Sequence, residues 1–170
     1  MLTKIKTLRE LFEIELKYAY DCEQKLFKKG IPAMLEAASS PELRDALEHH
    51  LEETRGQIAR LEQVFSIIGM EPDTKDNDIL DKTLSAAKDS VSNIESSSLR
   101  DTALIVNGNQ VEHYEIAMYG SLVAFARHLG LEEAIAPLEQ TLKQEKAADS
   151  KLTQIAETSM NARAAKYQAA

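Results

Sequence analysis

The chain of 170 residues has no tryptophan, four prolines, six glycines and one cysteine, and aromatic residues make up 5% of it. A composition poor in these residues and rich in Ala, Leu, Glu and Lys is typical of helices, so we predict an all-α fold. The single cysteine, Cys22, excludes a disulfide framework or a thiolate metal cluster within one chain. We interpret Cys22 as a small residue on a helix.

Long apolar runs are also missing from the sequence. Every apolar run is far shorter than the roughly 20 residues that a helix needs to cross a bilayer. Residues 1–10 contain no apolar signal region. We therefore expect no association with a membrane and a location in the cytoplasm, a compartment that keeps thiols reduced.

Basic residues are not in excess. The chain has 20 Lys and Arg against 28 Asp and Glu, which gives a formal net charge of −8. Nucleic-acid modules usually carry a basic excess or stripe, so we expect no nucleic-acid partner. Apolar residues make up 44% of the chain, which is enough for a core and argues against disorder. The length favours a single domain over residues 1–170.

Apolar periodicity and the residues at helix ends predict four long helical segments. Their expected ranges are 3–30, 41–68, 98–130 and 131–160. A serine cap in Ser39-Ser40-Pro41-Glu42 marks the start of the second, and Asp101 is a box-like acid after Ser98 at the start of the third. Gly69 and Gly130 mark helix ends.

Two stretches are less regular. Pro32 interrupts the first segment, so residues 31–38 are expected to form either a kinked extension or a separate turn. Residues 161–170 are predicted to be frayed, as chain ends commonly are.

The connections between the segments predict the topology. The first two segments are joined by a short connection, as are the last two, so each pair is expected to form an antiparallel hairpin. The long connection, residues 70–97, has apolar residues at helical spacing from Ile79 to Val91, which predicts a short helix. Two antiparallel hairpins joined by a long crossover with a short helix are the topology of a ferritin-like four-helix bundle.

Carboxylates lie on the apolar face of every long predicted helix. An ionised carboxylate on a buried face is costly unless it is paired or bound to a cation. Few basic residues share these faces, and Arg60 is the nearest. We therefore predict a metal site with a set of candidate ligands. They are Glu23, His50, Glu53, Glu112, Glu115, Glu145 and Asp149.

The alternative interpretation of these residues is a buried hydrogen-bonded network without metal. Their register supports the metal site, because Glu53 follows Glu23 by the same number of residues as Glu145 follows Glu115. The two hairpins then place paired Glu residues at matching heights. Carboxylates that converge in a core repel one another, and a pair of divalent or trivalent metal ions would neutralise them.

Three segments resemble the YciF-type bacterial stress proteins, which belong to the ferritin-like superfamily and are related to the rubrerythrins. They are HLEETRGQ at residues 50–57, VEHYEI at 111–116 and LKQEKAAD at 142–149. The pair Glu112-x-x-Glu115 also resembles the Glu-x-x-Glu of the rubrerythrin branch. The resemblance spans nearly the whole chain. It implies a ferritin-like fold, a homodimer, a role in stress and a di-iron or di-manganese cofactor.

One departure from the superfamily pattern concerns histidine. The pattern places a His three residues after a Glu on the second and usually the fourth helix. In this chain Gly56 stands at that distance from Glu53, and Ala148 stands at that distance from Glu145. The available imidazole is His50, before Glu53. The site is therefore expected to be rich in oxygen ligands, which weakens the case for an iron oxidase and leaves manganese, or no metal, as alternatives.

Several neighbours of the predicted site are less central to it. Glu15 is an outer candidate ligand, and His113 lies off the apolar stripe, so we expect it outside the ligand set or at the surface. Tyr20 and Tyr119 are predicted to face the core near the site, packed and hydrogen-bonded. His49 is predicted to be solvated.

Two functions are compatible with these residues. The first is a di-metal oxidoreductase, with iron or manganese, that acts on peroxide or oxygen. The second is a non-catalytic, dimeric helical scaffold that protects the cell under stress without binding metal. The sequence assigns no individual catalytic residue in either case.

Overall fold

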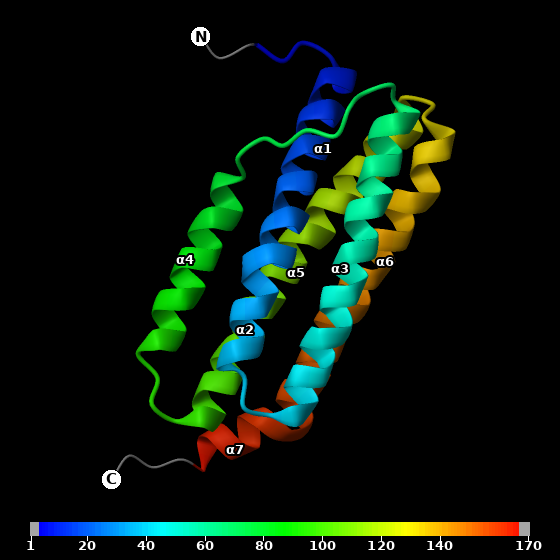
Figure 1. The fold of residues 1–170 in the computed structure, drawn as a ribbon. Helices are drawn as coiled ribbons and strands as arrows, with labels where there is room; N and C mark the ends of the chain where they lie inside the picture. The colour runs from blue at the N-terminus through cyan, green and yellow to red at the C-terminus, as the bar shows by residue number, and fades with distance from the viewer. Residues whose placement is uncertain (1–3, 167–170) are drawn as a thin grey trace.

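The computed structural model describes residues 4–166, and most of them are helical (Figure 1). Its helices are α1 Leu8–Lys25, α2 Ile31–Ala37, α3 Pro41–Ile67, α4 Asp78–Ser92, α5 Ser97–His128, α6 Glu132–Ile155 and α7 Asn161–Ala165. A π-helical turn at Leu26–Gly30 joins α1 to α2, and another at Ala156–Met160 joins α6 to α7. The predicted all-α fold is confirmed.

Four long helices form the bundle. Around it, α1 contacts α3, α3 contacts α6, α6 contacts α5, and α5 contacts α1. The crossover helix α4 packs against α5 and stands beside α1 and α2, outside the bundle (Figure 1). The expected pair of hairpins, joined by a long crossover with a short helix, is therefore confirmed. This arrangement directs one face of each long helix toward a common interior.

The first helix begins later than the sequence predicts. Thr7 and Glu10 form a capping box: the Thr7 side chain accepts from the backbone N–H of Glu10, and the Glu10 side chain accepts from that of Thr7. The helix therefore starts at Leu8, whereas residue 3 lies outside the described part. Ile5, which the periodicity places on the apolar stripe, precedes the helix and is 47% exposed.

The chain continues through Pro32 as a helix. Pro32 occupies the first turn of α2, directly after the π-helical turn, where its missing N–H costs little. Residues 31–37 are thus a helical extension rather than a separate turn. At the other end, residues 161–165 form α7, so the prediction of a frayed tail from residue 161 is wrong for them. Residues 167–170 of that tail lie outside the described part.

Asp101 has a different role from the one its position suggests. Ser96, not Ser98, caps α5 by accepting from the N–H of Leu99. The Asp101 carboxylate instead accepts hydrogen bonds from the N–H and hydroxyl of Ser39 and from the N–H of Ser40. The Ser40 side chain makes no cap bond. The carboxylate of Asp101, on α5, therefore satisfies backbone N–H groups just before the start of α3.

A glycine follows each of α3 and α5, just after the helix ends. Gly69 has φ +75° and Gly130 has φ +66°, in the left-handed region that glycine adopts without strain. In each case the next residue donates back to the helix, Met70 to the carbonyl of Phe65 and Leu131 to that of Ala126. The predicted helix ends at Gly69 and Gly130 are confirmed.

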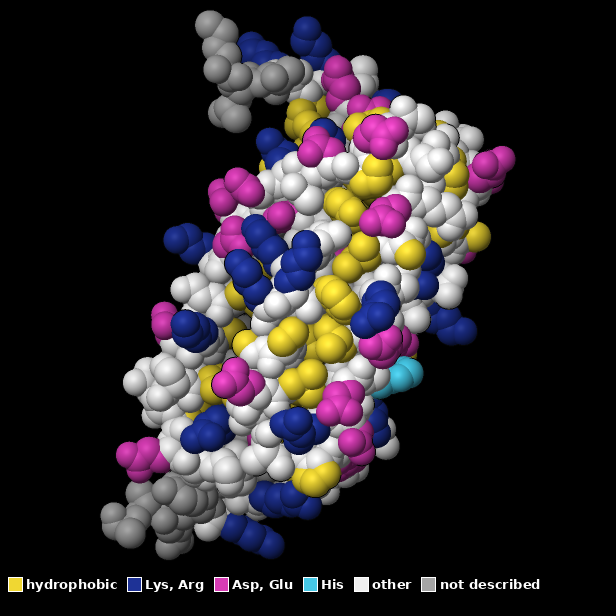
Figure 2. Space-filling model, viewed as in Figure 1, with side chains coloured by type: hydrophobic (Ala, Val, Ile, Leu, Met, Phe, Trp, Pro, Cys, Tyr) yellow, Lys and Arg dark blue, Asp and Glu magenta, His cyan; other side chains and the backbone are white. Residues whose placement is uncertain are grey.

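The surface mixes acidic and basic side chains, with an apolar strip over α1, α2 and α3 on the face drawn in Figure 2. Within residues 4–166, none of the helices is both long enough and apolar enough to cross a membrane. Apolar residues such as Phe12, Leu16, Val64 and Leu122 fill the interior. Carboxylates share that interior with them.

Candidate metal centre

A cluster of polar side chains lies in the middle of the apolar core. His50 comes from α3, Glu112 and Glu115 from α5, and Glu145 from α6. Each offers one ligand atom, and these atoms all lie within 4.8 Å of one another. The Nε2 atom of His50 is 3.3 Å from Glu112 Oε1 and 3.8 Å from Glu145 Oε2. This spacing is compatible with a single cation bound between them.

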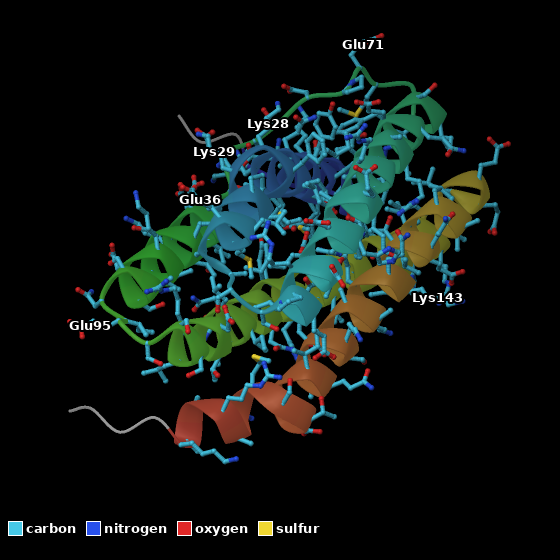
Figure 3. The ribbon with its side chains drawn as sticks, turned by 60° about the horizontal axis from the view of Figure 1, so that its bottom comes forward. Lys28, Lys29, Glu36, Glu71, Glu95 and Lys143 are labelled. Atoms are coloured by element: carbon cyan, nitrogen blue, oxygen red, sulfur yellow. The ribbon has the colours of Figure 1, made fainter. Side chains whose placement is uncertain are left out.

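Helix periodicity carries these residues inward. On α3, Leu43, Leu47, His50 and Thr54 follow one another at intervals of three or four residues, and all four are buried. The apolar residues thus determine which face of α3 packs in the core. His50 is buried because it lies on that face. Figure 3 shows side chains with oxygen atoms among them between the bundle helices, whereas the labelled Lys143 points away from this interior.

Each carboxylate of the cluster has at least one oxygen without a hydrogen-bond partner among the described residues. Glu145 and Glu115 are 0% and 1% exposed, and Glu112 is 4% exposed. Among the described residues, several buried carboxylate oxygens have no hydrogen-bond partner. They are Glu23 Oε2, Glu112 Oε2, Glu115 Oε2, Glu145 Oε1 and Glu145 Oε2. Buried polar atoms are normally hydrogen-bonded, so this group of acceptors fits a bound cation.

The pKa values report the same shortage of positive charge. Burial, then the neighbouring carboxylates, raises the pKa of Glu115 well above its usual range. Burial also raises the pKa of Glu145 well above that range and the pKa of Glu112 to about 8. Carboxyls in such a site hold either protons or a metal ion near neutral pH.

His50 connects the cluster to a further carboxylate. Its Nε2 atom faces the cluster, while its Nδ1 atom lies 3.5 Å from Glu53 Oε2. Burial lowers the pKa of His50, but the hydrogen bond to Glu53 and nearby carboxylates outweigh it, and the pKa is raised. A histidine with a carboxylate on the ring nitrogen away from the site is the usual arrangement at a metal centre.

Glu53 lies beside the cluster rather than in it. Its side chain is 18% exposed, and its Oε1 atom lies 3.5 Å from Nε2 of the exposed His49. The hydrogen bond with His50 lowers the pKa of Glu53, in contrast to the buried carboxyls. The predicted ligand Glu53 is therefore placed where it orients His50. His49 is solvated, as predicted.

Glu23 extends the acidic core toward α1. It is 0% exposed, and Tyr119 of α5 donates a hydrogen bond to its Oε1 atom. Burial and the charge of Glu145 raise the pKa of Glu23 to about 8. Glu23 is not among the four residues whose ligand atoms lie within 4.8 Å of one another. The packing and hydrogen bond predicted for Tyr119 are confirmed.

Asp149 points away from the cluster. Its Oδ1 atom accepts a hydrogen bond from Asn109 at 2.6 Å and lies 3.2 Å from Nε2 of the exposed His113. These partners hold Asp149 on the outer side of the contact between α5 and α6. The structure therefore separates Asp149 from the other predicted ligands, and His113 lies at the surface.

Two further residues lie away from the cluster. Glu15 lines a different cleft, together with Tyr114, and burial raises its pKa. The Tyr20 ring packs edge-on against Phe65 and its hydroxyl donates to the exposed Glu62, so the packing and hydrogen bond predicted for Tyr20 are confirmed. The direction of the hydroxyl places it away from the site.

Two other polar side chains of the core are not among the predicted ligands. The Cys22 thiol lies 3.7 Å from Glu115 Oε1. Gln57 is 0% exposed, and both polar atoms of its amide lack a partner among the described residues. Cys22 lies on the face that also carries Ala19 and Leu26, at helical spacing, which is the signal that could have placed it.

Arg60 is the basic side chain predicted nearest to the acids. It is half-buried, and its Nε atom donates to Thr141 at 2.9 Å. It also donates to Gln144. These bonds direct the guanidinium to polar side chains of α6, so they leave the oxygens of Glu145 without a donor.

Comparison with known proteins gives consistent relatives. A family model described as a domain of unknown function, DUF892, matches residues 7–165. Protein YciF of Escherichia coli strain K12 is 35% identical over 164 residues, 94% of this chain and 96% of that protein.

Solved structures share the fold. The crystal structure of the E. coli stress protein YciF has a TM-score of 0.87 at 35% identity, covering 92% of this chain and 99% of its own. YcfI from Rhodopseudomonas palustris, for which a structural role has been suggested, has a TM-score of 0.87 at 37% identity, covering 90% of this chain and 97% of its own. A protein from Xanthomonas campestris pv. campestris, at 24% identity and a TM-score of 0.73, covers 94% of this chain and 98% of its own.

Proposed function

The chain belongs to the DUF892 family, with the E. coli stress protein YciF among its relatives, and from this we propose that it is a stress protein whose bundle core binds a pair of iron or manganese ions. The observation that carries the proposal is the group of buried, unpartnered carboxylate oxygens, centred on Glu145. Both oxygens of Glu145 are buried without a donor. Leaving a buried charge without a partner is costly, and divalent cations compensate it.

The residues that would hold the metal are those of the cluster. His50, Glu112, Glu115 and Glu145 are the ligands for a first ion. Glu23, whose carboxyl interacts electrostatically with Glu145, adds ligand oxygens for a second. A donor set with one imidazole nitrogen and otherwise carboxylates suits manganese and iron(II) better than softer ions.

Each protein group has a defined part in this proposal. A bound pair of redox-active ions supplies electron exchange with oxygen or peroxide. Glu53 orients His50 through the Nδ1 atom. Tyr119 fixes one oxygen of Glu23. The apolar core buries Glu23, Glu115 and Glu145 almost completely, which strengthens electrostatic interactions between them.

Elemental analysis tests the proposal. Metal-free protein is loaded with Mn²⁺, or with Fe²⁺ under anaerobic conditions, and dialysed before the bound metal is counted. We expect about two ions per chain, as in other two-metal sites. The double variant Glu115→Gln/Glu145→Gln should retain none, whereas Glu133→Gln, an exposed acid at the start of α6, should bind as wild type does. Equal metal content in wild type and double variant would contradict the proposal.

A second candidate function is a structural, non-catalytic stress protein. The absence of Glu-x-x-His favours it, because Gly56 and Ala148 stand where the pattern has histidine. The structural role suggested for YcfI also supports it. In that case the buried carboxyls stay protonated, and Glu115→Gln changes stability but no binding property. The same metal analysis separates the two functions.

A homodimer is part of the same proposal. Large apolar side chains on α4 and α5 are exposed, namely Ile79 at 63%, Leu99 at 42% and Val106 at 51%. A second copy that covers them would remove apolar surface from water. Light scattering after size-exclusion chromatography should give twice the mass of the 18.9 kDa chain. A monomer at micromolar concentration would contradict it.

A further inference from the structure

A cleft of about 450 Å³ lies between α3 and α6. Its walls include Leu47 of α3 and the small side chains of Ala147 and Ala148 of α6. Two members of the cluster, His50 and Glu112, also line it. The cleft therefore connects solvent with the buried carboxylates.

Acidic residues dominate the charge of this cleft. Its ionisable lining comprises four acids, one lysine and two histidines, namely Glu42, Asp45, Glu53, Glu112, Lys151, His49 and His50. Glu42 and Asp45 are exposed, so their charges act on ions in solution. A cleft with an excess of one charge and low-dielectric walls concentrates ions of the opposite sign.

Oxygen acceptors continue from the opening of the cleft to its floor. Glu53 lies between an exposed and a buried histidine, with Oε1 3.5 Å from Nε2 of His49 and Oε2 3.5 Å from Nδ1 of His50. At the floor, Glu112 is 4% exposed, and its Oε2 atom has no hydrogen-bond partner among the described residues. An unpartnered carboxylate oxygen in an acidic cleft suits a cation as its ligand.

We infer that this cleft is the route by which a hydrated divalent cation reaches the cluster, with Glu42 and Asp45 attracting the cation and Glu53 passing it to the floor. The inference rests on the proposed metal site. The volume is sufficient, because each water occupies about 30 Å³ and a cation with an octahedral shell carries six. On this route Glu42 and Asp45 set the rate of loading, and the buried ligands set the affinity.

A second acidic cleft provides a matched control. It has a volume of about 360 Å³ and is lined by Glu15, Asp76 and Asp78, but by none of the four cluster residues. Asp76 and Asp78 are exposed, like Glu42 and Asp45. Neutralising either pair removes the same charge from the chain, so a change that follows only one pair depends on position.

The loading rate tests the inference. Co²⁺ is mixed with metal-free protein in a stopped-flow instrument, and its visible absorption reports binding. At low ionic strength we expect Glu42→Gln/Asp45→Asn to load at least about threefold more slowly than wild type. The bound stoichiometry should be unchanged. Asp76→Asn/Asp78→Asn should load at the wild-type rate, and the difference between the two variants should shrink as salt is added.

Closing the cleft tests the route without changing charge. Ala148→Leu places a larger side chain in the wall, and we expect it to slow loading about tenfold or more. Ala136→Leu makes the same substitution at an exposed position of α6 and should load as wild type does. Circular dichroism confirms that each variant is folded before its rate is measured.

The outcomes separate this inference from the proposed function. If wild-type protein takes up no metal, the proposed metal site is wrong, and the proposed route to it is wrong as well. If wild-type protein binds Co²⁺ but both the charge variant and Ala148→Leu load at the wild-type rate, the metal site stands and the route is overturned. Equal slowing in Asp76→Asn/Asp78→Asn would also overturn it, because net charge would then be the cause.

Discussion

The hydroxyl of Tyr119 donates a hydrogen bond to Oε1 of Glu23, joining α5 to α1 inside the bundle. Both side chains are 0% exposed. The other oxygen, Oε2, has no partner among the described residues. One buried carboxyl is thus half satisfied by the protein, and its remaining oxygen is the one that the proposed second metal ion would bind.

Tyr119→Phe should destabilise the metal-free protein. The substitution leaves Oε1 of Glu23 without its donor, which costs about 1–3 kcal/mol in the free energy of unfolding. Urea denaturation measures the difference. Tyr20→Phe is the control, because the Tyr20 hydroxyl donates to the exposed Glu62, and it should cost less than about 0.5 kcal/mol. Equal losses of stability in the two variants would show that the buried hydrogen bond contributes no more to stability than the exposed one.

Glu115→Gln should have opposite effects on stability and on metal binding. Burial raises the pKa of Glu115 well above its usual range, so ionising it in the folded protein costs free energy. The neutral amide avoids that cost, and metal-free Glu115→Gln should gain stability over wild type as the pH is raised. Its affinity for Mn²⁺ should fall by more than about tenfold. Urea denaturation at several pH values and equilibrium dialysis measure the two effects. An unchanged affinity would remove Glu115 from the ligand set.

Metal-free protein should lose stability as the pH rises from about 4.5 to about 8. The carboxyls of Glu23 and Glu112 have a pKa of about 8 in the folded protein, against 4.5 for an unperturbed glutamate. In that window the unfolded chain binds fewer protons than the folded one, so the free energy of unfolding falls with pH. The raised pKa of His50 acts in the same direction, because its contribution is lost as pH rises through the folded value.

Thermal unfolding across this range measures the effect. Tm of the metal-free protein should decrease steadily toward pH 8. Metal-loaded protein should gain stability over the metal-free form as pH rises, because bound cations replace the protons of their ligands. A Tm that is constant or rises for the metal-free protein would contradict the raised pKa values.

Asp101→Ala should destabilise the corner between α2 and α3. The carboxylate accepts from the N–H of Ser39 at 2.8 Å and from that of Ser40 at 2.9 Å, and Ser40 is buried. Without it a buried backbone donor loses its partner, which costs about 1–3 kcal/mol. Asp89→Ala, at an exposed position of α4, is the control and should change stability by less than about 0.5 kcal/mol. Urea denaturation compares both with wild type.

The helices and the presence of acids in the core could be predicted from the sequence alone. Apolar spacing placed α3, α5 and α6 to within a few residues, because each helix must bury one continuous face. Gly69 and Gly130 marked helix ends, since both adopt a positive φ. The same periodicity carried Glu112, Glu115 and Glu145 inward, and all three are buried.

Which of these acids converge depends on the packing of the whole bundle. The sequence predicts Glu53 at the border of its apolar stripe and Asp149 inside one, but such a stripe is wide enough that helix spacing alone permits either an inward or an outward side chain. Contacts with other side chains determine the direction of each carboxylate. His50 holds Glu53 beside the cluster, and Asn109 holds Asp149 outside it. The spacing within one helix defines a face only to within a wide angle, whereas a ligand set requires distances between helices, and these are set by tertiary packing.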